Sequence, residues 1–121
     1  MGRRMTTVLV VDDEHDLRTA VAGVLQDEGY EVIECSDGRQ ALDVLAPRRP
    51  DVALVDVMMP FVSGVEVVEA ARRDPTLDGL PIVLMSAVDD PSLKEGVAAF
   101  LKKPFPLKRL LRTLTDVLER H

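Results

Sequence analysis

The sequence of 121 residues predicts an α/β fold, with a doubly wound parallel sheet of five strands covered by helices on both faces. Three short runs of apolar, partly β-branched residues, at 8–11, 52–55 and 82–85, are typical of strands buried on both faces. Segments with apolar residues at helical spacing alternate with these runs. No repeat, linker or low-complexity segment interrupts the alternation, so we expect one domain.

The first half of the chain carries signals for two helices and one further strand. Apolar residues recur at helical spacing after the first strand until Gly29, a residue type that favours the position just past a helix end. Residues 30–35 alternate loosely between apolar and polar and predict a more exposed strand. Asp37 can then cap a second helix, which we expect Pro47 to close.

The second half repeats this pattern. Ser63 and Glu66 have the spacing of a capping box and predict a helix after the central strand. Residues 98–101 predict a brief fifth strand. The last helix is expected to start at Pro106, because one clear apolar stripe follows it.

Polar side chains stand at the carboxyl ends of these strands. Right-handed crossovers between five strands favour the flavodoxin-like strand order 2-1-3-4-5, with the switch point between the first and third strands. The first strand ends at Asp12 and Asp13, and the third ends at Asp56. The predicted topology therefore brings three carboxylates together, and it places Ser86 and Lys103 on the same edge.

Three neighbouring carboxylates repel one another unless a cation lies between them. Oxygen ligands without histidine or cysteine select Mg²⁺, or Mn²⁺, rather than zinc. With the Lys103 ammonium and the Ser86 hydroxyl on the same rim, the set predicts a site that handles a phosphoryl group. The chain has no glycine-rich phosphate loop, which disfavours nucleotide binding.

Composition narrows the remaining possibilities. The net charge of −6 argues against nucleic-acid binding by this domain alone, and no apolar run is long enough to span a membrane. A single cysteine, Cys35, cannot form an internal disulfide, which suits the reducing cytoplasm. We expect residues 1–6 to form an N-terminal tail rather than a signal peptide, and residues 7–121 to form the domain.

Five motifs, taken in order, resemble those of the bacterial two-component response regulator receiver domain, in its single-domain, chemotaxis-regulator form. Each is weak alone, but together they cover nearly the whole chain at the expected strand ends. They are Val10-Val11-Asp12-Asp13-Glu14, Ser36-Asp37-Gly38 with Ala41-Leu42, Asp56-x-x-Met59-Pro60-x-x-x-Gly64, Ser86-Ala87 and Lys103-Pro104-Phe105.

The resemblance implies that Asp56 is the phosphoacceptor, which takes a phosphoryl group from a phosphohistidine of a sensor kinase or phosphotransfer protein. It also implies that Asp12 and Asp13 hold Mg²⁺ together with Asp56 and the backbone carbonyl of Met58. Lys103 would pair with a phosphoryl oxygen.

The same resemblance implies a two-state switch and a cis peptide bond. Ser86 would bond the phosphoryl group, and Phe100 occupies the position of the switch aromatic residue. The Lys103–Pro104 bond would be cis.

Each of these residues also has a plainer interpretation. Asp12 or Asp13 could cap the first helix, and Ser86 could be an ordinary turn residue. Phe100 could belong simply to the core. His15, beside the acidic residues, fits a solvated position in the first helical turn better than a metal ligand.

The segment between Ser86 and Lys103 is shorter than in most receivers, by roughly one turn or more of helix. Gly96 within it further disfavours a helix. We therefore predict that the fourth helix has two turns or fewer, or is a loop. Phosphorylation and its readout would then be separable, because the route from Ser86 to Phe100 passes through this segment.

Two other classes of function are open. A degenerate receiver would act as an interaction module without phosphorylation, and the short fourth helix is the feature in its favour. A small Mg²⁺-dependent phosphatase would need an acid two residues after its nucleophile, where this chain has Met58. We therefore expect no enzyme activity beyond the domain's own phosphorylation and dephosphorylation.

The sequence ends at the last helix, which predicts either a stand-alone receiver, with a homodimer possible, or part of a longer regulator. The resemblance implies that the domain acts on an output protein or on an output domain of a longer regulator.

Overall fold

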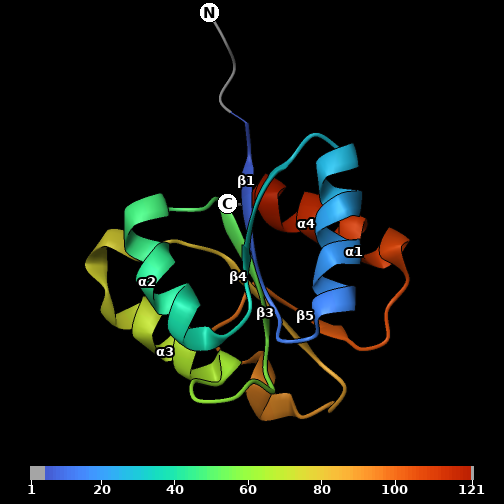
Figure 1. Cartoon of the computed structure of the whole chain (residues 1–121). Helices are drawn as coiled ribbons and strands as arrows, with labels where there is room; N and C mark the ends of the chain where they lie inside the picture. The colour runs from blue at the N-terminus through green and yellow to red at the C-terminus, as the bar shows by residue number, and fades with distance from the viewer. Residues whose placement is uncertain (1–4, 121) are drawn as a thin grey trace, which may run out of the picture.

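The computed structural model describes residues 5–120 and confirms the predicted parallel sheet. The five strands lie in the order β2-β1-β3-β4-β5, and every pairing is parallel (Figure 1). The switch point lies between β1 and β3, as expected. The strands are β1 (Thr7–Val11), β2 (Glu31–Cys35), β3 (Val52–Asp56), β4 (Ile82–Ser86) and β5 (Ala99–Lys102).

Helices cover both faces of the sheet. In Figure 1 the sheet runs down the middle, with α2 and α3 on one side and α1 and α4 on the other. Within the described residues, no helix is both long and apolar enough to cross a membrane. The helices are α1 (His15–Asp27), α2 (Gly38–Arg48), α3 (Gly64–Arg73) and α4 (Leu107–Arg120), with two 3₁₀ turns, η1 (Pro75–Leu77) and η2 (Pro91–Lys94).

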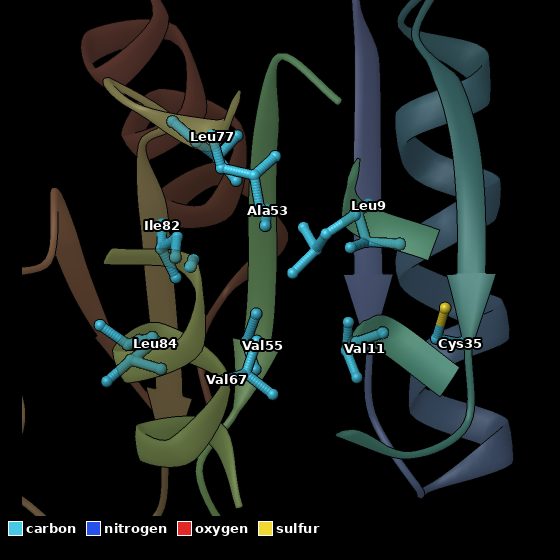
Figure 2. Close-up of a cluster of buried hydrophobic side chains, with 14 of the residues drawn as sticks. Leu9, Val11, Cys35, Ala53, Val55, Val67, Leu77, Ile82 and Leu84 are labelled. Atoms are coloured by element: carbon cyan, nitrogen blue, oxygen red, sulfur yellow. The ribbon is translucent and has the colours of Figure 1, made fainter. Parts of the chain in front are cut away.

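Two apolar clusters fill the space between the sheet and its helices. Alternate residues of a strand enter opposite clusters, so Leu9 and Val11 belong to one, whereas Val8 and Val10 belong to the other. Figure 2 shows the first cluster, with labelled side chains of β1, β3 and β4 and with Val67 of α3 beside Val55 of β3. Because both faces are covered, the first polar residue after each inner strand stands at the boundary between core and solvent.

The backbone just before β1 is hydrogen-bonded to β2. The Glu31 N–H donates to the Thr6 carbonyl at 2.9 Å, so backbone pairing begins one residue before the expected boundary at residue 7. Residues 1–4 of the predicted tail lie outside the described residues.

The prediction that Pro47 closes α2 was wrong by one residue. The helix continues to Arg48 and ends where Arg49 adopts a left-handed φ of 44°. Proline removes only one N–H donor, and the Arg49 N–H still donates to the Leu45 carbonyl at 2.9 Å. A proline in the last turn is therefore compatible with one more helical residue.

The predicted shortening of the helix between β4 and β5 is confirmed, because η2 is a single 3₁₀ turn. The Asp90 side chain caps it by accepting the Ser92 N–H at 3.0 Å. Gly96, two residues after η2, has a left-handed φ of 71°, which stops further helix. Arg72 of α3 holds this segment, since its guanidinium donates to the carbonyls of Gly96 at 2.7 Å and Leu80 at 3.2 Å.

Candidate functional site

Asp12 directly follows β1 and is held at every polar atom. Its N–H donates to the Cys35 carbonyl at 3.1 Å, which extends the pairing with β2. One carboxylate oxygen accepts the Glu14 N–H at 2.9 Å, and the other accepts from Lys103 Nζ at 2.8 Å. With an exposed fraction of 1%, Asp12 is a buried and fully hydrogen-bonded carboxylate rather than a solvated surface acid.

Asp56 is the last residue of β3 and is 4% exposed. Its neighbours along the backbone are constrained by Gly64, the first residue of α3. A Cβ at Gly64 would collide with the Asp56 carbonyl and lie 2.9 Å from the Val57 Cα. The Gly64 N–H donates to the Val57 carbonyl at 3.0 Å, so the chain folds back tightly against the strand end. The glycine in the third motif is therefore required by close backbone approach.

The three predicted ligands meet at the carboxyl edge of β1 and β3. One carboxylate oxygen from each of Asp12, Asp13 and Asp56 lies within 4.8 Å of the others. Asp13 is exposed, whereas Asp12 and Asp56 are buried. The donor set consists only of carboxylate oxygens, which fits a hard divalent cation such as Mg²⁺ and its preference for keeping several water ligands. The acidic cluster could hold such an ion, with Mn²⁺ as the alternative.

Lys103 supplies the positive charge of the site from the end of β5. Its Nζ lies 2.8 Å from Asp12, 3.4 Å from Asp56 and 3.3 Å from Glu14. The peptide bond to Pro104 is cis, as the resemblance implied. The contact with Glu14 was not predicted. Its signal in the sequence is that Glu14 directly follows Asp12 and Asp13, so it lies near the same edge of the sheet.

Burial and neighbouring charges shift the pKa values of Asp56 and Lys103. Burial raises the pKa of Asp56 from 3.8 to about 6, with Lys103 opposing the shift and the charges of Asp12 and Asp13 adding to it. Burial lowers the pKa of Lys103, but the hydrogen bond to Asp12 and the charges of Asp56 and Asp12 outweigh it, so its pKa is raised. Lys103 therefore remains an ammonium ion, while Asp56 carries electrostatic strain that a divalent cation would relieve.

The two predicted switch residues lie on the same face of the sheet, and each has partners outside the acidic cluster. The Ser86 hydroxyl accepts the Val88 N–H at 3.0 Å, and the Ser86 carbonyl accepts the Lys103 N–H at 2.8 Å. Phe100 pairs in register with Leu84 and packs, half-buried, against the cluster shown in Figure 2. Lys94 of η2 lies over the Phe100 ring, 5.5 Å from its centroid. The geometry is compatible with both interpretations of Phe100, as a switch and as core.

Apolar side chains stand exposed in the loop that follows Asp56. Met58 is 69% exposed and Phe61 is 75% exposed. Phe61 has a left-handed φ of 68°, and Arg39 of α2 lies over its ring at 4.8 Å from the centroid. The sequence carried no signal for this contact.

His15 is exposed and its Nδ1 lies 3.2 Å from Arg18 Nη2, which agrees with its interpretation as a surface residue.

Comparison with known proteins agrees with this geometry. Residues 8–115 match the response regulator receiver domain. The chain is 41% identical to the response regulator MprA of Mycolicibacterium vanbaalenii, an alignment that covers 93% of this chain and 50% of MprA. It is 34% identical to the phosphate regulon transcriptional regulatory protein PhoB of Pseudomonas aeruginosa, over 94% of this chain and 52% of PhoB. The chain thus spans about half the length of these two relatives.

Solved structures show the same similarity over a whole chain. The chemotaxis response regulator CheY4 of Vibrio cholerae superposes with a TM-score of 0.88 at 39% identity, covering 94% of this chain and 99% of CheY4. A response regulator of Chloroflexus aurantiacus gives a TM-score of 0.90 at 30% identity, covering 97% and 100% of the two chains.

A doubly wound sheet with an acidic cluster and a lysine at its carboxyl edge defines a receiver-type α/β domain. The chain belongs to the response regulator receiver domain family of two-component systems.

Proposed function

We propose that this domain accepts a phosphoryl group on Asp56 from a phosphohistidine of a sensor kinase or phosphotransfer protein. The observation that carries the proposal is a buried carboxylate with two further acids within 4.8 Å and a lysine ammonium at 3.4 Å. An acid buried among acids is destabilised in the metal-free protein, so a structural role alone does not account for it. A cation and a phosphoryl group together would satisfy the charges present.

The residues of the chain divide the work of the transfer. An Asp56 carboxylate oxygen attacks phosphorus, forming an O–P bond as the N–P bond to the donor histidine breaks, and the histidine nitrogen keeps the electron pair. Asp12, Asp13, Asp56 and the backbone carbonyl of Met58 would hold Mg²⁺, which neutralises charge on the transferred group when bound. Lys103 leaves Asp56 for a phosphoryl oxygen of the product.

The response of the domain would follow from new contacts of the phosphoryl group. Ser86 gives up its bond from the Val88 N–H and donates its hydroxyl to the phosphoryl group. Phe100 on the neighbouring strand then shifts within its half-buried position. The short η2 turn replaces a longer helix here, so the surface that an output protein contacts is smaller and differently shaped.

The domain's partners would be proteins. The relatives include a transcriptional regulatory protein, but the net charge of −6 does not favour nucleic-acid binding by this domain itself. We expect no phosphatase turnover of other substrates, because Met58 stands two residues after Asp56, where such an enzyme would need an acid. We expect action in the cytoplasm, where the buried thiol of Cys35 would stay reduced.

Intact mass after incubation with acetyl phosphate tests the proposal. One added phosphoryl group is expected with Mg²⁺, and none with a chelator. Asp56→Asn abolishes the adduct, whereas Asp43→Asn, an exposed aspartate of α2, retains it.

Two results would count against the proposal. An adduct on Asp56→Asn would place the chemistry on another residue. No adduct on the unaltered chain, together with no response to beryllofluoride, would favour a phosphorylation-independent interaction module instead. A beryllofluoride response without an adduct would indicate a short-lived phosphoryl group and keep the proposal.

A further inference from the structure

Arg18 of α1 binds the backbone of the acidic cluster rather than its carboxylate oxygens. Its Nη1 donates to the backbone carbonyl of Asp12 at 2.8 Å, and its Nε donates to Glu34 of β2 at 3.2 Å. The third nitrogen, Nη2, faces His15 Nδ1 at 3.2 Å. Only 13% of the Arg18 side chain is exposed, so the guanidinium is held in one place by groups from three directions.

The carbonyl that Arg18 binds belongs to the peptide joining two of the three cluster acids. The Asp12 N–H is held by Cys35 and its carboxylate by Glu14 and Lys103, so its carbonyl is the one remaining polar atom of the residue. The bond from Arg18 fixes the plane of the Asp12–Asp13 peptide. The orientation of this peptide plane in turn restricts where the Cα and Cβ atoms of Asp13 can lie.

Asp13 depends on this constraint more than Asp12 does. It is the exposed member of the cluster, with no strand pairing and no buried packing of its own. A carboxylate on a mobile peptide loses conformational entropy when it binds an ion, and that loss weakens binding.

The charge of Arg18 is balanced locally. Glu34 lies 3.2 Å from its Nε, so the pair places little net charge beside the cluster. A bare guanidinium here would repel a cation. We call this pair of hydrogen bonds, from one guanidinium to the Asp12 carbonyl and to the Glu34 carboxylate, the Arg18 fork. It needs the planar guanidinium with its several donors, which an ammonium group cannot reproduce.

We propose that Arg18 is a positioning residue for the divalent cation: with Glu34, it holds the Asp12–Asp13 peptide so that both carboxylates meet the ion. This inference rests on the proposed function and adds a link from β2 to the metal site. Arg18 touches neither the ion nor the phosphoryl group, so it acts entirely through Asp12.

Isothermal titration with MgCl₂ on the whole chain tests the proposal directly. Arg18→Met is expected to weaken Mg²⁺ binding by about tenfold, as loss of an outer hydrogen bond to a metal ligand commonly does. Arg18→Lys keeps the charge but loses the fork, and it should bind as weakly as Arg18→Met. Arg48→Met is the matched control, because Arg48 of α2 also pairs with a β2 glutamate, Glu31, at 3.6 Å, and should leave binding unchanged.

A second measurement separates positioning from general loss of structure. The rate of acetyl phosphate labelling of Arg18→Met should fall at limiting Mg²⁺ and recover to within about twofold of the unaltered chain at saturating Mg²⁺. A rate that stays low at saturation would show a structural defect and overturn the proposal. If Arg18→Met does not fold, Arg18→Lys carries the test, because it keeps the charge and loses only the second donor, with binding expected to weaken by about tenfold.

The outcomes distinguish this inference from the proposed function. Unchanged Mg²⁺ affinity in Arg18→Met, or full rescue by Arg18→Lys, would overturn the role of the fork while leaving Asp56 as phosphoacceptor. Absence of Mg²⁺ binding and of labelling in the unaltered chain would overturn the proposed function itself, and this inference with it.

Discussion

Replacing Asp56 with asparagine is expected to stabilise the metal-free domain at neutral pH. The folded domain raises the pKa of Asp56 from 3.8 to about 6, so it binds this proton more tightly than the unfolded chain does. Stability is therefore highest when Asp56 is protonated, and it falls as the pH rises from about 4 to about 6. At about 1.4 kcal/mol per pH unit, the ionised carboxylate costs about 3 kcal/mol above pH 6.

Urea unfolding followed by circular dichroism, in the presence of a chelator, measures this cost. The free energy of unfolding of Asp56→Asn minus that of the unaltered chain should grow by about 2.4 kcal/mol between pH 4 and pH 7. Millimolar Mg²⁺ at pH 7 should narrow the difference, because the ion stabilises only the chain that binds it well. Asp43→Asn, on the exposed face of α2, should show no such trend.

A difference that does not change with pH would refute the reasoning, since the electrostatic cost exists only when Asp56 is ionised. A loss of stability in Asp56→Asn at pH 7 without metal would refute it too. That result would mean that the attraction between Lys103 and Asp56, 3.4 Å apart, outweighs the burial of the carboxylate.

Two further substitutions test the backbone arrangement around the site. Gly64→Ala should destabilise the domain by about 2 kcal/mol or more, because its Cβ would collide with the Asp56 carbonyl. Gly23→Ala, inside α1, should stabilise it by about 0.5–1 kcal/mol, because the added Cβ would meet no atom of another element within 4 Å. Equal effects on urea midpoints would contradict the close approach at Gly64. Arg72→Ala should cost about 1–2 kcal/mol and speed amide exchange around Gly96, because the Gly96 carbonyl loses two donors. Unchanged exchange there would show that the segment after η2 is held by other contacts.

Much of the fold could be predicted because its signals are local. Fully apolar runs indicate strands covered on both faces, and a polar residue at the end of such a run indicates the edge of the sheet. These signals predict that Asp12 and Asp56 lie at the same edge of the sheet, as the structure shows. A fourth helix of two turns or fewer, or a loop, was also predictable between β4 and β5, since the segment is short and contains Gly96.

The wrong helix end at Pro47 and the missed contact of Phe61 both depend on packing beyond the local sequence. Pro47 does not end α2, because the cost of one missing donor depends on how many turns follow, which sequence alone does not show. The Arg39–Phe61 contact joins a helix to a loop whose path depends on packing.

By itself, the sequence determined which residues form strands, the order in which parallel crossovers can arrange them, and which edge carries the acids. Tertiary structure alone decided how those acids are balanced. Lys103 donates to Asp12 across 91 residues of chain, and Arg18 of α1 donates to the Asp12 carbonyl. Periodicity reports which side of an element is buried, whereas the partner of each charge and the pKa of Asp56 depend on distances set by the packed whole.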